Sequence, residues 1–540
     1  MKSGTIVCID FPAVEDGLFS SVRRLTKTFE STLRSCFQVV TPPDYVDAMP
    51  KAKRASVYVE LLRQSSVIIT SSPRRWLKAR EQSRVRRPCI FLPLGEGPRG
   101  ASKLRGVFSM LTTQDVIAFA STAEKDVFDV LVRSCAARTF MLPFFVDTDF
   151  FKPLPAARRK AIRTSLGLTP ENVVVLYAGR ITAEKNVHTL LVLINMLAEQ
   201  HRNVRLLVVG APDDRFVFRT LGGTGVDLAA VFRKVLELDL LKTRVAFTGQ
   251  TVSGDDLASL YGAADIFASL TLHHDENFGF SQVEAMSSGL PVVCTDWGGL
   301  KDTVTHGKTG FRLNTRMGRE GPRIDLSAGF QYCSRLIRDV NLRQTMGAAA
   351  RERALKEYAI PVFRRRLQAL VSFACEKPPS LKKRSNSLTP WGRRFDRTFR
   401  APRVTKSFTG IEPFVEKGAP ISARYNRQCK HFYESLLTPF CSGRYRLDFS
   451  DDGVIFWAVL SFWFAKNSIV VEDPLFPGRY DIGPNERRLL RFLDRRLLDG
   501  YSFTSVSEAR EAGLSPNVLL KCLNGLVRKG ILMVSSPQVT

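Results

Sequence analysis

The first 150 residues alternate short, continuous apolar runs with longer amphipathic stretches. The apolar runs have the length and uninterrupted hydrophobicity of strands in a parallel sheet, where helices cover both faces. The amphipathic stretches between them predict helices, for example over Phe19–Leu33 and Ala123–Ser134. This alternation predicts a doubly wound α/β domain. Its expected strands are Ile6–Ile9, Phe37–Val40, Val67–Thr70, Cys89–Leu92, Val116–Phe119 and Thr139–Leu142.

The same pattern then restarts and predicts a second domain of this kind, joined to the first around Phe151–Ser165. Two Rossmann-like α/β domains in tandem would face one another across a cleft. Open sheets of this type bind ligands at the carboxyl ends of their strands, which places a site in that cleft. The expected strands are Asn172–Tyr177, Val204–Val209, Arg244–Phe247, Ile266–Ser269, Pro291–Cys294 and Gly310–Leu313, with helices near 187–199, 226–239, 254–262 and 280–288.

The composition changes abruptly after residue 376. Residues 377–425 are rich in Lys, Arg, Pro and Ser and lack apolar periodicity, so they are expected to form a disordered basic linker. The domain boundaries that follow are 1–160, 161–376, 377–425, and an accessory region over 426–540.

The accessory region is expected to be a small, mostly helical domain. Residues 485–535 suggest two helices, a turn at Gly513–Ser515, a helix over Pro516–Lys529 and a strand over Ile531–Val534, which is typical of a winged-helix module. The apolar run Val454–Ala465 is too short to span a bilayer and fits a buried helix, a buried strand or an interfacial element.

Charge and cysteine content bear on partners and compartment. The chain has 79 Lys and Arg against 52 Asp and Glu, a net charge of +27, so nucleic acid, anionic lipid and phosphorylated small molecules are candidate partners. Its ten cysteines are scattered, without metal-ligand spacing, as expected for buried thiols in a reducing compartment. No signal peptide is visible, and a cytoplasmic location is expected, with peripheral attachment to the inner face of a membrane as an alternative.

The strongest motif runs from Glu276 to Met286 and continues as Gly289-Leu290-Pro291-Val292-Val293. A helix is expected to begin near Gly279, where the backbone N–H groups of Phe278, Gly279 and Phe280 would bind a diphosphate at the positive end of the helix dipole. Glu284 could then accept hydrogen bonds from ribose hydroxyls, and Glu276 from hydroxyls of a transferred sugar. The alternative is an ordinary helix N-terminus with acidic residues nearby.

A second motif, Gly179–Asn186, directly follows the expected strand Asn172–Tyr177. Arg180 and Lys185 would lie at the carboxyl end of that strand. Cations there would stabilise the negative charge that develops on a departing phosphate more strongly in the transition state than in the ground state. Taken alone, the motif also fits a solvated first helical turn.

Together these motifs closely resemble the C-terminal half of the retaining glycosyltransferases of family four. The resemblance is specific from about Val173 to Leu313 and looser over the first 165 residues. It implies the glycosyltransferase B fold, a nucleotide-diphosphate-sugar co-substrate, retention of anomeric configuration, and neither a required metal nor another cofactor. It also implies that residues 1–160 bind the acceptor and residues 161–376 the donor, and that Tyr358–Phe373 crosses back to the first domain.

The first domain departs from the family pattern. Relatives often carry a pair of glycines after the first strand, where this chain has only Gly17. They also often carry a histidine of the first domain near the reacting sugar, whereas the first domain of this chain contains no histidine. Gly17 is accordingly expected to contact the donor, and the acceptor chemistry is left open. His273 and His274 either reach the donor or lie in an exposed loop.

Three basic or glycine-rich features suggest further contacts. Seven Lys and Arg residues between Arg74 and Arg87 surround Trp76, which suits either an anionic membrane surface or a solvated basic helix. The loop Leu94–Gly100 would line the cleft or simply connect elements. In the winged-helix-like module Lys521, Arg528 and Lys529 could contact nucleic acid, but the leucines of that helix favour protein or peptide docking over nucleic acid.

Two functions follow from these observations. The first is a retaining, metal-independent glycosyltransferase of the hexosyltransferase type that acts on an unidentified acceptor, which could be a sugar, a lipid, a peptide or a natural product. The second is a catalytically idle scaffold of the same fold. Such a scaffold would bind a partner, an anionic membrane or nucleic acid through the basic C-terminal third of the chain.

Overall fold

The structure is a computed structural model of the 540-residue chain. It describes residues 4–11, 20–93, 104, 107–181, 185–211, 244–248, 250, 252, 254–272, 276–318, 321–377, 386–390, 393, 454–457, 462–471, 478–498, 504–529 and 531–535.

The chain divides into two compact units, and each unit combines segments that are distant in sequence. The first comprises Met1–Asp147, His274–Phe280 and Leu355–Val404, and the second comprises Thr148–His273, Ser281–Ala354 and Thr405–Thr540. The expected boundary near residue 160 therefore lies close to the first of several points at which the chain passes from one unit to the other.

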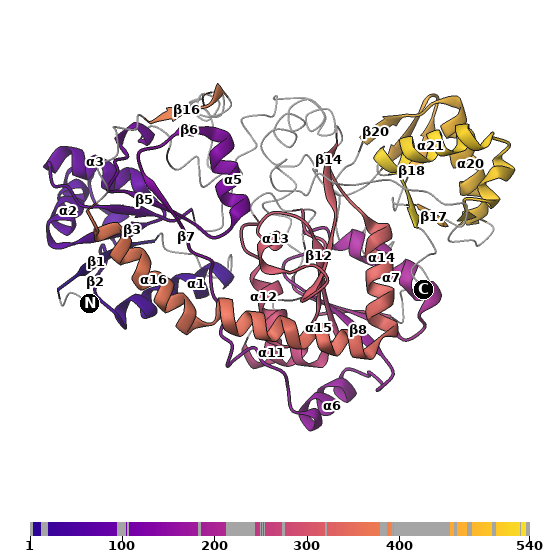
Figure 1. The fold of residues 1–540 in the computed structure, drawn as a ribbon, viewed down its shortest axis with the longest axis horizontal. Helices are drawn as coiled ribbons and strands as arrows, with labels where there is room; N and C mark the ends of the chain where they lie inside the picture. The colour runs from indigo at the N-terminus through magenta and orange to yellow at the C-terminus, as the bar shows by residue number, and fades with distance from the viewer. Residues whose placement is uncertain are drawn as a thin grey trace. The chain divides into compact units, whose positions relative to one another are not determined.

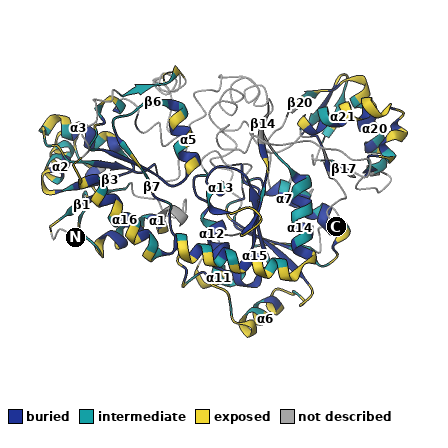
Figure 2. Ribbon diagram, viewed as in Figure 1, coloured by how far each residue is buried: buried dark blue, intermediate teal, exposed yellow. Residues whose placement is uncertain are grey.

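The first unit contains a six-stranded parallel sheet in the order β2-β1-β3-β4-β5-β7. The four inner strands β1, β3, β4 and β5 are short apolar runs with buried side chains, whereas the edge strands β2 and β7 are only partly buried (Figure 2). The sequence pattern located all six strands to within a residue or two. The strands are β1 (Ile6–Asp10), β2 (Gln38–Val40), β3 (Val67–Thr70), β4 (Cys89–Phe91), β5 (Val116–Phe119) and β7 (Arg138–Met141), and the helices and short turns among them are α1 (Ser20–Arg34), η1 (Val46–Ala48), α2 (Lys51–Gln64), α3 (Pro73–Ser83), η2 (Phe108–Met110) and α5 (Thr122–Leu131).

The second unit contains another six-stranded parallel sheet, in the order β10-β9-β8-β11-β12-β13. This is the strand order of nucleotide-binding Rossmann sheets, and it reverses direction between β8 and β11. The expected α/β Rossmann-like fold is confirmed. The strands are β8 (Val173–Ala178), β9 (Val204–Val209), β10 (Val245–Phe247), β11 (Ile266–Ser269), β12 (Val292–Thr295) and β13 (Gly310–Leu313), followed by the hairpin β14 (Thr315–Gly318) and β15 (Gly321–Ile324).

Helices surround this second sheet. Three of the four predicted helices are present as α7, α11 and α12, whereas the helix expected near 226–239 lies outside the described residues. The helical elements are α6 (Ala156–Ser165), α7 (Val187–Gln200), α11 (Gly254–Ala263), α12 (Phe280–Ser287), α13 (Leu300–Thr303), α14 (Leu326–Arg338), α15 (Val340–Arg353) and the π-helical turn η3 (Ala354–Tyr358).

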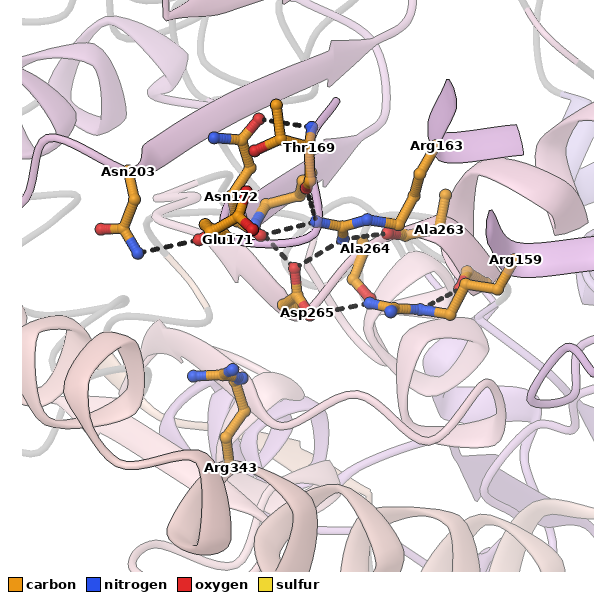
Figure 3. A network of polar contacts seen from close by, with 12 residues as sticks. Arg159, Arg163, Thr169, Glu171, Asn172, Asn203, Ala263, Ala264, Asp265 and Arg343 are labelled. Carbon is orange, nitrogen blue, oxygen red and sulfur yellow. Dashed lines mark hydrogen bonds and ion pairs between the residues drawn. The ribbon is translucent and has the colours of Figure 1, made fainter. Parts of the chain in front are cut away.

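A partly buried ion-pair network joins α6 to the strands that follow it (Figure 3). The Asp265 carboxylate accepts from Arg159 at 2.7 Å, from Arg163 at 2.9 Å and from the backbone N–H of Val174 at 2.8 Å. Arg163 also donates to the carbonyls of Thr169 and Asn172, at 3.0 and 2.6 Å. The loop between α6 and β8 is thereby attached to the start of β11 at several points.

The last helix before the basic segment packs in the first unit. This helix, α16 (Ile360–Cys375), lies beside α1, and its Phe363 ring contacts Phe29 and Phe145 at 5.4 and 4.7 Å between ring centroids (Figure 1). Arg138 donates to the carbonyl of Phe373 at 2.8 Å.

Part of the expected disordered linker is ordered, which corrects that prediction. Ser387–Leu388 forms strand β16, which pairs antiparallel with β6 (Val132–Ser134), a strand that replaces the expected C-terminal end of the helix over Ala123–Ser134. Asn386 accepts from the N–H of Ala136 at 2.7 Å and donates to the carbonyl of Leu111 at 2.8 Å. Specific side-chain hydrogen bonds thus attach a segment whose composition suggested disorder, and most of the remaining linker lies outside the described residues.

The accessory region is mixed α and β rather than mostly helical. Two three-stranded antiparallel sheets, β21-β17-β22 and β18-β19-β20, share one core with two α-helices. The run Val454–Ala465 contributes β17 and β18 rather than a helix. The elements are β17 (Val454–Trp457), β18 (Phe462–Ala465), β19 (Ser468–Val471), β20 (Gly478–Asp481), α20 (Pro484–Leu498), β21 (Thr504–Ser505), the 3-10 helix η7 (Glu508–Ala512), α21 (Pro516–Lys529) and β22 (Leu532–Ser535).

The predicted turn before α21 is present, with Gly513 in the left-handed region at a φ of 70°. The winged-helix assignment itself stays a prediction. One of its three candidate nucleic-acid contacts has another role, because Lys529 Nζ donates to both carboxylate oxygens of Glu486 on α20, at 2.8 Å each. Within the described part of the chain, no helix is long and apolar enough to cross a membrane.

Candidate functional site

The carboxyl ends of β8 and β11 meet where the strand order of the second sheet reverses. Gly179 and Arg180 directly follow β8, and the N–H of Gly179 donates to the carbonyl of Val209 at 2.9 Å. Gly210 has a φ of 148°, and a Cβ atom there would overlap the Gly179 carbonyl oxygen. A glycine is therefore required at Gly210 so that the segment before Arg180 can lie against β9.

Asn186 attaches the second motif to the end of β11. It adopts the left-handed conformation, with φ 57° and ψ 34°, immediately before α7. Its side-chain amide donates to the carbonyl of Leu270 at 3.0 Å, and Thr189 donates back to its side-chain oxygen. Lys185 directly precedes this anchor and is half-buried. The motif thus begins at the carboxyl end of β8 and ends against β11, which places Arg180 and Lys185 at the strand-order reversal.

Glu284 lies in the middle of α12 and is buried. Its Oε2 atom accepts a hydrogen bond from the Tyr261 hydroxyl at 2.9 Å, and the same hydroxyl lies 3.1 Å from the carbonyl of Ser281. Tyr261 is fully buried at the end of α11 and packs against Phe151 with 5.4 Å between ring centroids. Tyr261 therefore holds the Glu284 carboxylate in a defined orientation.

The segment before α12 is set by aromatic packing within the first unit. Gly279 has a φ of 87°, a conformation that favours glycine, immediately before α12 begins at Phe280. The Phe278 ring contacts Phe144 and Tyr358, with 5.5 and 5.6 Å between ring centroids, and Phe280 stacks on Phe144 at 5.7 Å. Gly279 thus lies where a helix begins, as predicted, and four aromatic rings pack around this segment.

The predicted site residues are distributed over both units. Gly179, Arg180, Lys185 and Glu284 belong to the second unit, whereas Glu276, Phe278, Gly279 and Phe280 belong to the first. Glu276 is half-buried. Gly17, His273, His274 and the loop Leu94–Gly100 lie outside the described residues. Sequence reasoning gave no role to Tyr261 or Asn186, whose importance depends on hydrogen bonds across 23 and 84 positions of the chain.

The suggested membrane-binding function of the Arg74–Arg87 stretch is not supported by its side chains. Trp76 is fully buried in the core, and its indole N–H donates to Asp10 Oδ2 at 2.6 Å. Arg80 forms an ion pair with the buried carboxylate of Asp115 at 2.7 Å. The aromatic residue and one of the cations of this stretch therefore stabilise the first unit from within rather than forming a surface.

Metal-ligand clusters and cysteine thiols are two kinds of reactive group that the described residues could supply. Among the described residues, no three His, Cys, Asp or Glu side chains form a group that could hold a metal ion. The described cysteines are mostly buried, and burial raises the pKa of the Cys333 thiol to about 12. That thiol is therefore protonated and unreactive at neutral pH.

The residues just described coincide with a known family pattern. Residues 158–317 match the family model of the group 1 glycosyl transferases. This segment contains Gly179, Arg180, Lys185, Glu276 and Glu284. Both predicted motifs therefore lie in the part of the chain that matches this family.

Curated relatives are glycosyltransferases of several kinds. The chain is 31% identical over 214 residues to the sulfoquinovosyl transferase of Arabidopsis thaliana, which covers 39% of this chain and 35% of that protein. It is 31% identical over 225 residues to the D-inositol 3-phosphate glycosyltransferase of Mycobacteroides abscessus, and this match covers 41% of this chain and 46% of that protein. It is 30% identical over 246 residues to a GDP-mannose-dependent phosphatidylinositol monomannoside mannosyltransferase of Mycobacterium tuberculosis, and this match covers 44% of this chain and 56% of that protein. The chain thus spans between a third and somewhat over half of the length of these relatives.

Solved structures share the fold. The HepE protein of Anabaena, in complex with UDP, superimposes with a TM-score of 0.51 at 18% sequence identity, over 68% of this chain and all of that one. A glycosyltransferase from Rickettsia africae superimposes with a TM-score of 0.50 at 15% identity, over 69% of this chain and all of that one. At these identities the likeness establishes the α/β fold alone.

Proposed function

We propose that the chain is a retaining glycosyltransferase that takes a sugar from a nucleotide-diphosphate-sugar donor. The observation that carries this proposal is the group of residues at the strand-order reversal of the second sheet. Gly179, Arg180 and Lys185 follow β8, and Glu284 lies on the helix after β11. The match to group 1 glycosyl transferases covers the same residues.

Each residue has a distinct role in this proposal. Arg180 and Lys185 neutralise the charge that develops on the leaving diphosphate, so the reaction requires no metal ion. The backbone at Phe278, Gly279 and Phe280 is assigned to the diphosphate, and Gly17 is assigned to the donor from the sequence alone. Glu284 accepts hydrogen bonds from the ribose, and Glu276 accepts them from the transferred sugar. Tyr261 is a positioning residue that acts through Glu284.

The acceptor is proposed to be bound by the first unit. A sugar, a lipid, a peptide and a natural product are all hydroxyl-bearing candidates, and two of the relatives act by name on an inositol phosphate and on a phosphatidylinositol derivative. We further propose that the protein acts in the cytoplasm, with the C-terminal module serving to dock a protein or peptide. Peripheral contact with an anionic membrane and binding of nucleic acid are the alternative roles for that basic third of the chain.

A panel of nucleotide sugars tests the proposal directly. The purified chain is incubated with UDP-, GDP- and ADP-sugars, and release of nucleoside diphosphate and thermal stabilisation are measured. One donor is expected to stabilise the protein and to be consumed. A folded sample that binds none of them would favour the idle scaffold, and a salt-sensitive complex with DNA or anionic vesicles would then identify its partner.

Removal of the Glu284 carboxylate is expected to weaken donor binding. Glu284→Ala removes a charge-assisted hydrogen-bond acceptor, and we expect the Kd for the donor to rise by about tenfold to a hundredfold. Tyr261→Phe keeps the Glu284 carboxylate but removes the hydroxyl that orients it, so we expect the Kd for the donor to rise by about threefold to tenfold. Isothermal titration with the active donor measures both.

The exposed residue Asp256, on the nearby helix α11, provides a matched control for these variants. Asp256→Ala removes a carboxylate without touching Glu284, and it should bind the donor as the parent does. Unchanged donor affinity in Glu284→Ala would contradict the assignment of the ribose to this residue.

A further inference from the structure

A pocket of about 160 Å³ opens at the amino ends of β8, β9 and β10. It lies at the opposite end of the second sheet from Gly179 and Arg180, which follow the carboxyl end of β8. None of the residues to which the proposed transfer reaction assigns a role lines it. Its walls include Leu166, Leu168, Val174, Leu206, Arg205 and Arg244.

Two arginines give this otherwise apolar pocket a positive charge. Arg205 Nη1 donates to the carbonyls of Arg202 and Val204, at 3.0 and 2.8 Å, and Arg244 Nη1 donates to the carbonyls of Ala198 and His201, at 3.1 and 3.2 Å. Within the described ranges, neither guanidinium forms an ion pair with a carboxylate. Backbone carbonyls hold both groups in place but do not neutralise them.

The two cations also act on one another. The pKa of Arg244 is lowered, first by burial and next by the positive charge of Arg205; Glu199 opposes this shift, and Arg202 adds to it. Among the described residues that act on Arg244, two are cations, Arg205 and Arg202, and one is acidic, Glu199. A bound anion would relieve the repulsion between Arg205 and Arg244 and would gain hydrogen bonds from planar donors that suit carboxylate and phosphate groups.

The wall formed by Leu166–Leu168 belongs to the loop that the Asp265 network shown in Figure 3 attaches to the sheet. Leu168 N–H donates to the carbonyl of Arg163 at 2.9 Å, and the Arg163 side chain donates to the carbonyls of Thr169 and Asn172. A pocket whose wall is fixed before binding loses little conformational entropy when a ligand enters.

The volume of the pocket limits the size of its ligand. An apolar cavity of about 150 Å³ holds a benzene molecule, whereas sites for drug-sized ligands are about 300–1,000 Å³. A nucleotide sugar is therefore too large for this pocket, and inorganic phosphate would leave its apolar walls uncovered.

We propose that this pocket binds a small organic anion, whose apolar body of about six to eight non-hydrogen atoms lies against the leucine and valine side chains and whose carboxylate or phosphate contacts Arg205 and Arg244. Because the pocket lies away from the proposed donor site, the anion is a second ligand of the donor-binding unit rather than a substrate of the transfer reaction.

Benzoate and phenyl phosphate test this proposal on the full chain, with benzyl alcohol and inorganic phosphate as matched probes. We expect both aromatic anions to saturate one site with a Kd of about a millimolar or below in isothermal titration. Benzyl alcohol has the apolar body without the charge, and phosphate has the charge without the body, so each should bind at least about tenfold more weakly. Equal binding of either matched probe would overturn the proposal.

Variants locate the probe. Arg205→Gln is expected to weaken benzoate binding by about tenfold or more, and Arg205→Lys, which keeps the charge but not the fork, by less. The control is Arg158→Gln, because Arg158 is exposed on α6, does not line the pocket and is not among the charges that act on Arg244. Unchanged affinity in a folded Arg205→Gln protein, or displacement of benzoate by the nucleoside diphosphate of the active donor, would show that the probe binds elsewhere. Retention of donor binding by Arg205→Gln would separate this site from the proposed active site.

Discussion

Replacement of Arg180 by alanine is expected to lower kcat by about a hundredfold to a thousandfold while the Kd for the donor changes by less than about threefold. The guanidinium follows β8 at the strand-order reversal, where a departing diphosphate would gain charge as the sugar leaves. Its contribution is therefore larger in the transition state than in the ground state. Steady-state turnover and isothermal titration with the active donor measure the two quantities separately.

Two variants complete that test. Lys185→Ala is expected to lower kcat by about tenfold to a hundredfold, because an ammonium group contributes charge without the bidentate geometry of arginine. Arg158→Ala removes an exposed arginine of α6 and should leave both quantities unchanged. If Arg180→Ala weakened donor binding by as much as it slowed turnover, the residue would act in ground-state binding and its proposed role would be wrong.

The second large effect concerns stability. Asp265→Ala is expected to reduce the free energy of unfolding of the second unit by about 3–5 kcal/mol, because it leaves the buried Arg163 guanidinium without its carboxylate. The backbone N–H of Val174 loses its partner in the same variant. Urea unfolding of the full chain, together with hydrogen exchange at β8 and α6, measures the loss and shows whether it is local.

Asp256→Ala is the control for this prediction, since Asp256 is exposed on α11 in the same unit. Loss of the Asp256 carboxylate should lower the free energy of unfolding by less than about 1 kcal/mol, because only its interaction with the helix dipole is removed. A stability change in Asp265→Ala no larger than that in Asp256→Ala would mean that the network shown in Figure 3 contributes little to the fold.

The sheets could be predicted from the sequence because most of their strands are short, mainly apolar runs between longer amphipathic stretches. Val67–Thr70 and Val204–Val209 have the same bounds in the prediction and in the structure. The strand pair β6 and β16 could not be predicted in this way. Its two partners lie about 250 positions apart, and one of them belongs to a basic segment without periodicity. Only tertiary hydrogen bonds, such as those of Asn386, give that segment its conformation.

The site was predictable to the extent that it depends on local backbone geometry. The start of a helix near Gly279 follows from the sequence, and so does the position of Arg180 after a strand. Tyr261 was not predictable, because its contact with Glu284 depends on how two helices pack. The basic neighbours of Trp76 suggested either an anionic membrane surface or a solvated basic helix, yet its ring is buried in one cluster with Cys8, Ile68 and Cys89 of the sheet.

The interleaving of the two units has a consequence for the order in which the chain folds during synthesis. The first unit begins at the N-terminus but needs Leu355–Val404, including the contact of Phe363 with Phe29, to be complete. A ribosome must therefore translate most of the polypeptide before that unit can close its apolar interior. All strands of the second unit's sheet, of which β13 is the last, leave the ribosome before Leu355–Val404 does. The second sheet is therefore expected to complete its folding before the first unit does.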